Sequence, residues 1–163
     1  MELQNYEVKP FVNFAEDWAL LTAGTINDFN SMTIAWGGLG TIWNKPVAFL
    51  LVKPSRYTFD FVQKHTEITV SWYDEKFKKE LASTFGAKSG RDINKVAQSG
   101  FTPEEIDGCV TYKEASQTIV LKKLFMQQLD RSLLPKECFK WYPLGTKEEQ
   151  LHYLIIAKVL KIA

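Results

Sequence analysis

The sequence is poor in the residues that most enzymes use for catalysis on their own. It contains only two histidines, His65 and His152, and two cysteines, Cys109 and Cys138, among 163 residues. It has no GxSxG elbow, no HExxH pair and no paired-carboxylate signature, and it offers no Ser–His–Asp triad or histidine metal site. An enzyme of this composition would therefore take its reactivity from a bound cofactor.

Other absences limit the partners and the setting. The net charge is +1, so no global field favours nucleic acid. No apolar run approaches the roughly 18 residues that a membrane span needs, and the N-terminal segment lacks the pattern of a signal peptide. The cysteines form no CxxC pair or zinc spacing, which favours free thiols in the reducing cytoplasm. A disulfide bond between the two cysteines is the alternative.

The pattern of apolar residues predicts one domain, residues 1–163, that is mainly β with a few short helices and forms a closed or nearly closed barrel. The glycine cluster at 37–40 is expected to be a bend or bulge between strands. Helices are expected from Ser55 to His65, where Phe59 and Val62 share one side, and over 74–86. Strands are expected at 18–25, 32–36, 47–52, 67–73, 109–112, 118–127 and 151–160.

The stretch from Val52 to Phe61 has the composition of an anion site. A buried strand ends at Lys53-Pro54 and a helix is expected to begin at Ser55, which leaves free backbone N–H groups and the positive end of the helix dipole at one place. Lys53 and Arg56 add positive charge. Neutral hydroxyl donors come from Ser55, Tyr57 and Thr58. The alternative is an ordinary helix start with solvated charges beside it.

A second basic stretch runs from Ala87 to Lys95. Ser89 and Gly90 allow a tight turn, and Asp92 is the expected N-cap of a short helix. Arg91 and Lys95 then lie one turn apart and are expected to reach a common anion. An exposed charged turn is the other interpretation. Together the two stretches predict a phosphate-bearing ligand, since charge-assisted hydrogen bonds are the strong ones.

Strand 32–36 is expected to have one bulky face and one small face. Met32, Ile34 and Trp36 alternate with Thr33 and Ala35. The small face would let a flat ligand approach the backbone, or it would simply be solvated.

In order along the chain, these segments resemble the flavin reductase-like family, and in particular its flavoredoxin-type branch. The resemblance runs from about Trp18 to the last strand. The segments that carry it are Asn30–Gly37, Lys45-Pro46, Val52–Thr58, Thr69–Ser71, Ser89–Asp92 and Lys95.

The resemblance implies an FMN-binding split β-barrel that works as a homodimer, with NADH or NADPH as a possible electron donor and a possible redox partner protein. It implies that the isoalloxazine ring is lined by Met32, Thr33, Ala35 and Trp36, largely through backbone groups. It also implies two groups of residues that hold the phosphate: Lys53, Pro54, Ser55, Arg56, Tyr57 and Thr58, which also reach the ring edge, and Ser89, Gly90, Arg91 and Lys95.

The last strand departs from the family pattern. Many of its reductases have a His followed, after four residues, by Gly-Glu-Val, whereas here His152 and Val159 flank Ala157 and Lys158. An ammonium in place of a carboxylate reverses the local charge and puts direct use of NAD(P)H in doubt. His152 is expected either to touch the nicotinamide side of the site or to be a satisfied strand histidine.

Three functions follow as hypotheses. The leading one is an oxidoreductase that passes electrons from NAD(P)H through FMN to an acceptor. The second is a flavoredoxin-like electron carrier that a partner protein reduces, and the third is a flavin-free barrel that binds another ligand.

Overall fold

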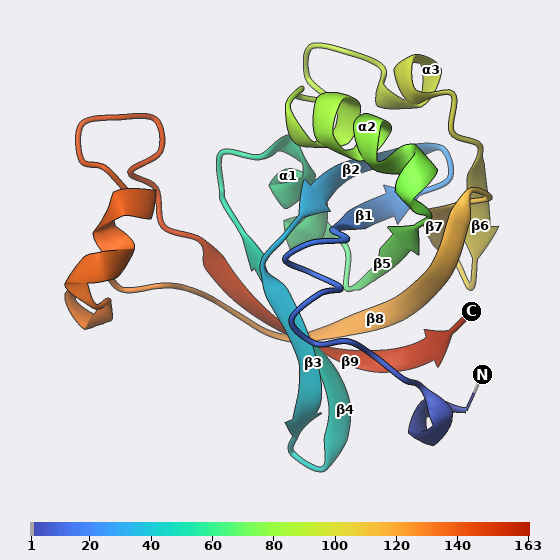
Figure 1. Cartoon of the computed structure of the whole chain (residues 1–163), viewed down its shortest axis with the longest axis horizontal. Helices are drawn as coiled ribbons and strands as arrows, with labels where there is room; N and C mark the ends of the chain where they lie inside the picture. The colour runs from blue at the N-terminus through green and yellow to red at the C-terminus, as the bar shows by residue number, and fades with distance from the viewer. Residues whose placement is uncertain (1) are drawn as a thin grey trace.

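The computed structural model describes residues 2–163 and is organised around one curled antiparallel sheet (Figure 1). Strands hold 42% of the residues and helices 22%, which confirms the expected mainly β class. The strands are β1 (Ala19–Thr25), β2 (Asp28–Ile34), β3 (Gly37–Ile42), β4 (Lys45–Val52), β5 (Glu67–Tyr73), β6 (Pro103–Ile106), β7 (Cys109–Tyr112), β8 (Ala115–Gln128) and β9 (Tyr153–Ile162).

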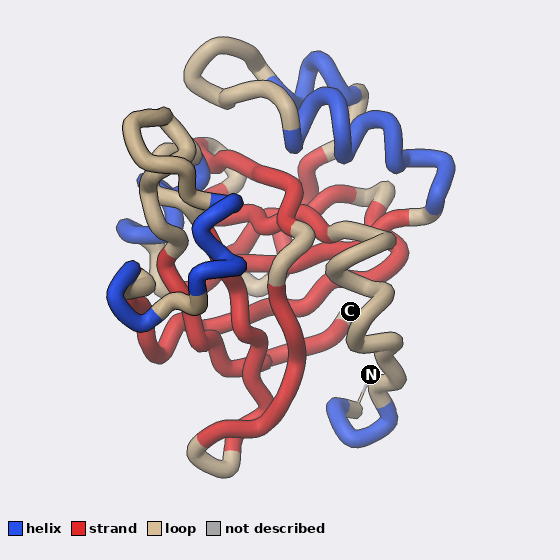
Figure 2. The backbone as a smooth tube through the Cα atoms, turned by 60° about the vertical axis from the view of Figure 1, so that its left-hand side comes forward, coloured by secondary structure: helices blue, strands red, loops and turns tan. Residues whose placement is uncertain are grey.

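The order of the strands explains how the sheet curls. In the large sheet the order is β2-β1-β5-β8-β9-β4-β3, while β6 and β7 form a separate hairpin. The two edge strands, β2 and β3, follow each other in the chain with only Ala35 and Trp36 between them. One bent extended segment therefore pairs with β1 along its first half and with β4 along its second. Figure 2 shows the resulting curled arrangement of strands.

Two expected boundaries near this segment were wrong. Gly37–Gly40, expected to be a bend, is the first part of edge strand β3, which pairs with β4. The turn before β4 lies at Trp43-Asn44, where both residues have positive φ, 52° and 54°. Two consecutive residues with positive φ are typical of the tight hairpin turn that matches strand twist. Strand β2 also begins earlier than expected, at Asp28.

The core inside the sheet follows the alternation in the sequence. Ile68, Val70 and Trp72 of β5 all point into the main apolar cluster, as expected. Phe59 and Val62 of α1 (Tyr57–Lys64) are buried in the same cluster. Burial of such side chains contributes about 1.5–3 kcal/mol each, so this cluster holds α1 against β1 and β2.

A second apolar cluster lies beneath the helical segment between β5 and β6. The expected single helix over 74–86 is divided into η2 (Glu75–Phe77), α2 (Lys78–Glu80) and a π-helical turn, η3 (Leu81–Gly86). Leu81 and Phe85 are nevertheless buried, as the four-residue spacing predicted. The hydroxyl of Thr33 in β2 donates to the carbonyl of Leu81 at 2.6 Å, which ties this segment to the sheet.

The remaining helices are short. Helix α3 (Lys95–Ser99) is capped by Asn94, whose side chain accepts a hydrogen bond from the amide of Ala97 at 3.0 Å, and not by Asp92 as expected. Between β8 and β9 lie η4 (Arg131–Leu133) and η5 (Lys136–Trp141), in a lobe that projects to one side of the sheet (Figure 1).

Among residues 2–163, no helix is long and apolar enough to cross a membrane, and no three His, Cys, Asp or Glu side chains gather as metal ligands would. Both cysteines are free thiols, and burial raises the pKa of Cys109 to about 11.

Candidate functional site

A cavity of about 580 Å³ opens where β2 passes into β3, and four parts of the chain line it. They are the end of β2, the turn between β4 and α1, the segment 85–92, and residues from the lobe that precedes β9. Its size is that of a typical small-molecule site. Of the residues expected at the site, it is lined by Met32, Thr33, Ala35, Trp36, Lys53, Ser55, Arg56, Tyr57, Thr58, Ser89, Gly90 and Lys95.

Two expected residues do not line the cavity, Pro54 and Arg91. Arg91 faces a neighbouring cavity of about 630 Å³. Its guanidinium pairs with Asp60 at 2.7 Å and stacks over the ring of Tyr57, 4.7 Å from the ring centroid. Arg91 and Lys95 both line this neighbouring cavity, and of the two only Lys95 also lines the main one. Lys88, from the same basic stretch, lines the main cavity instead.

The β2–β3 break gives the cavity a wall of backbone. The paired register of β2 ends at Ile34, and that of β3 begins at Gly37. The peptide groups of Ala35 and Trp36 are thus outside any strand ladder, and both residues line the cavity. Peptide groups need hydrogen-bonding partners, so this wall suits a planar ligand with polar atoms along its edge.

The turn between β4 and α1 supplies hydroxyls and one unpaired guanidinium. Helix α1 begins at Tyr57, two residues later than expected, and Arg56 is its N-cap. The Arg56 guanidinium is exposed and makes no hydrogen bond or ion pair with any residue in the described part of the chain. The Thr58 hydroxyl accepts a hydrogen bond from Asn30 Nδ2 at 2.7 Å, so its own proton remains available to a ligand.

The other two expected cations are already engaged. Lys53 is buried, and its ammonium contacts the carboxylate of Glu148 and donates to the Glu148 carbonyl at 3.2 Å. Lys95 is also buried and donates to the carbonyls of Ser31 and Phe85, each at 2.9 Å. Burial and the nearby charge of Arg56 lower the pKa of Lys95 to about 8. Lys95 thus adds positive charge to the wall of the cavity, while its hydrogen bonds go to backbone carbonyls of the protein.

The loop that carries Gly90 is packed directly against β2. A Cβ on Gly90 would lie 2.1 Å from Asn30 Oδ1 and 3.1 Å from Tyr57 Cδ1, far inside normal contact distances. A glycine is therefore required here by close approach.

We expect Gly90→Ala to lower the free energy of unfolding by about 1–3 kcal/mol, because the loop or the Asn30 side chain must shift. Gly38→Ala is the matched control, since nothing lies within 4 Å of a Cβ at Gly38. Urea denaturation of both variants tests this. Equal midpoints for the two would show that the close packing at Gly90 is not needed.

The opposite end of the cavity is aromatic and joins Trp36 and His152 to residues of the lobe that the sequence did not assign to the site. Trp36 lies 4.9 Å from the His152 ring and 5.4 Å from the Trp141 ring, measured between centroids. The hydroxyl of Tyr142 is 2.8 Å from His152 Nδ1. Of the lobe, Lys140, Trp141, Pro143 and Glu148 line the cavity. Two of these four residues belong to the run Trp141-Tyr142-Pro143, which matches no known motif.

The imidazole of His152 is held neutral. Burial first, and then the charges of Lys53 and Arg56, lower its pKa from 6.5 to about 4. Between these two pH values the unfolded chain binds a proton that the folded chain does not, so stability rises as the pH rises from 4 to 6.5.

We expect this histidine to contribute about 1–2 kcal/mol to that rise, because its ring is still partly solvated. Urea denaturation between pH 4 and pH 7 measures the slope. His152→Gln should flatten it, whereas the control His65→Gln should not. An unchanged slope in His152→Gln would contradict the assignment.

Comparison with known proteins shows which folds are similar. No protein-family model matches the sequence, and no curated protein sequence matches it significantly. Solved structures do match. A flavoredoxin from Methanosarcina acetivorans has a TM-score of 0.70 and 15% identity over 100% of this chain and 73% of its own.

Two further structures agree with it. An FMN-binding domain of a flavin reductases-like enzyme from Shewanella baltica OS155 has a TM-score of 0.66 and 16% identity, over 93% of this chain and 70% of its own. A styrene monooxygenase flavin reductase from Pseudomonas putida S12 has a TM-score of 0.64 and 18% identity, over 90% of this chain and 77% of its own. The chain therefore has the split-barrel fold of these flavin proteins, which confirms the expected fold.

Proposed function

We propose that the chain is an FMN-binding oxidoreductase of the flavin reductase-like family. The observation that supports this best is the cavity itself. It joins the peptide groups of Ala35 and Trp36, which lie outside the paired registers of β2 and β3, to the hydroxyl-rich turn that carries Arg56. A ring with polar edges and a phosphate tail matches these two ends in one ligand.

In this proposal the phosphate lies at Arg56 and Lys88. These are cavity cations that pair with no carboxylate among the described residues. The hydroxyls of Ser55, Thr58 and Ser89 line the same end and provide neutral donors. Charge-assisted hydrogen bonds of this kind are the stronger class. Pro54 and Arg91, which the resemblance also placed here, are left without a direct role.

The isoalloxazine ring then lies along residues 32–36. The backbone of Ala35 and Trp36 would orient its polar edge, and Met32 and Trp36 would exclude water from it. Bound FMN supplies the redox chemistry by accepting a hydride and passing on electrons. The protein's contribution is to bind and orient the group, and neutral His152 adds an uncharged polar ring to the same cavity.

Direct reduction by NADH or NADPH is the leading form of this function. The unusual Ala157 and Lys158 lie within β9, and neither lines the cavity. Their departure from the family pattern therefore does not alter the wall of the proposed FMN site. An electron carrier reduced by a partner protein is the second candidate, since the TM-score of 0.70 is to a flavoredoxin.

A visible absorption spectrum of the purified protein, with identification of any released flavin, tests the cofactor. Rapid mixing with NADH and with NADPH then separates the two forms of the function. We expect bleaching of the flavin band with at least one nucleotide. A flavin that stays oxidised with both but is reduced by a reductase protein would favour the carrier. A colourless protein that takes up no FMN would favour the flavin-free barrel.

We also propose a homodimer in the cytoplasm. Large apolar side chains are exposed around the cavity and on the neighbouring lobe, Trp36 at 36%, Trp141 at 52% and Leu144 at 72%. A second copy would cover such residues. Light scattering of the purified protein measures the assembly, and a monomer at micromolar concentration would contradict this part of the proposal.

A further inference from the structure

The lobe between β8 and β9, residues 129–152, forms a strap beside the cavity, and its two ends are tied together. The amide of Leu129 donates to the carbonyl of His152 at 2.9 Å, and Gln128 Nε2 donates to the carbonyl of Leu151 at 3.1 Å. Connections this long are uncommon in small domains and are usually functional. Four residues of the strap, besides His152, line the cavity.

Few apolar contacts hold the strap in place. Tyr142 is its only buried residue, at 3% exposure. Leu133 and Leu144 are 82% and 72% exposed. A segment with so little buried apolar surface opens at low free-energy cost, so its polar contacts decide whether it stays closed.

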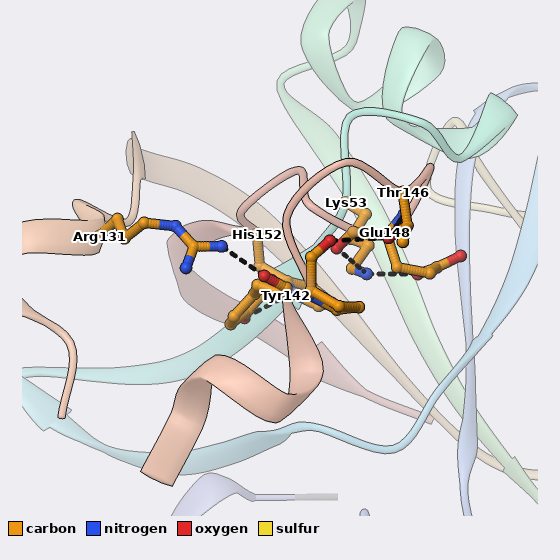
Figure 3. A network of polar contacts seen from close by, with 7 residues as sticks. Lys53, Arg131, Tyr142, Thr146, Glu148 and His152 are labelled. Carbon is orange, nitrogen blue, oxygen red and sulfur yellow. Dashed lines mark hydrogen bonds and ion pairs between the residues drawn. The ribbon is translucent and has the colours of Figure 1, made fainter. Parts of the chain in front are cut away.

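Lys53 makes the polar contacts that join Glu148 of the strap to the barrel (Figure 3). The Lys53 ammonium contacts the carboxylate of Glu148, donates to the Glu148 carbonyl at 3.2 Å and lies 5.4 Å from the centroid of the Tyr142 ring. Within the strap, Arg131 donates to the carbonyl of Tyr142. Lys53 directly follows β4, so it joins the strap to the barrel.

The environment of Lys53 differs from that of a lysine whose ammonium binds a phosphate group. The Lys53 side chain is only 7% exposed, whereas that of Glu148 is 42% exposed. The Lys53 contact also lowers the pKa of the Glu148 carboxyl group, mainly through the hydrogen bond, so this carboxylate stays ionised at neutral pH.

We propose that Lys53 is a positioning residue that anchors the strap through Glu148, and that this anchor slows the release of a ligand from the cavity. The identity of the ligand as FMN rests on the proposed function, but the anchor does not. The two possible roles of Lys53 make opposite predictions for Glu148→Gln. A phosphate-binding lysine freed from its carboxylate would hold FMN more tightly, whereas an anchor that is lost would release it faster.

The first experiment measures FMN dissociation from the purified, reconstituted protein by stopped-flow fluorescence. Lys53→Met and Glu148→Gln should each release FMN about tenfold faster than the wild type. The charge-swapped double variant Lys53→Glu with Glu148→Lys should recover most of that loss. Glu137→Gln, an exposed carboxylate on the same strap, is the matched control and should behave as the wild type. Release that is unchanged or slower in Glu148→Gln would overturn the proposal.

The second experiment uses the FMN-free protein. Trypsin cleavage after Lys140, an exposed strap residue, should be several-fold faster in Glu148→Gln than in Glu137→Gln, because cleavage follows the population of the open segment. Equal rates would overturn the anchor. A wild-type chain that takes up no FMN would refute the proposed function alone, and the trypsin comparison would still decide the role of Lys53.

Discussion

Replacing Arg56 by alanine is expected to weaken FMN binding by about 1.5–3 kcal/mol, roughly tenfold to a hundredfold, while riboflavin binding changes little. Arg56 lines the cavity at the N-cap of α1, and its guanidinium pairs with no carboxylate among residues 2–163. A dianionic phosphate would be its first charged partner. Riboflavin has the same ring without that phosphate, so the difference between the two ligands isolates the contact.

Fluorescence titration of both ligands against both proteins measures this difference. Arg91→Ala is the matched control, because Arg91 pairs with Asp60 and faces the neighbouring cavity. We expect it to affect FMN much less than Arg56→Ala does. If FMN and riboflavin lose affinity equally, or if Arg91→Ala has the larger effect, the phosphate does not lie at Arg56.

The sequence could predict the part of the site whose residues are brought together by elements that directly follow one another in the chain. A buried strand, a proline and an amphipathic helix follow one another at 47–64, so the residues of the β4–α1 turn had to gather at one place. The alternation of Ile68, Val70 and Trp72 fixed the inward face of β5 in the same way. Both features depend only on residues that are close in the sequence, and both are present in the structure.

The partners of the cations depend on distant parts of the chain, and sequence reasoning missed them. Lys53 meets Glu148 across 95 positions, and Lys95 meets the carbonyl of Ser31 across 64. A side chain's charge is visible in the sequence, but whether a carboxylate or a carbonyl already occupies it is decided by tertiary packing. For the same reason the pairing of Arg91 with Asp60, 31 positions away, was not visible in the sequence.

The glycine cluster at 37–40 shows a related limit. Glycine is unfavourable inside strands, so a bend was the local expectation. In the structure a Cβ on Gly37 would lie 2.6 Å from the ring of Phe14 and 2.8 Å from the carbonyl of Phe49. This glycine lets the edge strand β3 pack closely on residues far away in the chain, which no local pattern reveals.

Phe85 links the second core cluster to the cavity, and its side chain is 1% exposed. The ring packs against Phe101 at 5.3 Å and Tyr112 at 5.6 Å, measured between centroids. Its carbonyl accepts a hydrogen bond from the Lys95 ammonium, so this one residue of η3 supports both the packing and the buried charge. π-helical turns are rare and often occur at functional sites.

We therefore expect Phe85→Ala to lower the free energy of unfolding by about 3–5 kcal/mol, because a large buried ring is replaced by a cavity. Phe11→Ala is the matched control, since Phe11 is 87% exposed and its loss should change stability by less than about 0.5 kcal/mol. Urea denaturation measures both. Phe85→Ala should also weaken FMN binding, because Phe85 lines the cavity and its ring centroid lies 6.0 Å from the Lys95 ammonium. If Phe85→Ala were as stable as Phe11→Ala, the ring of Phe85 would not be packed in the second core cluster as described.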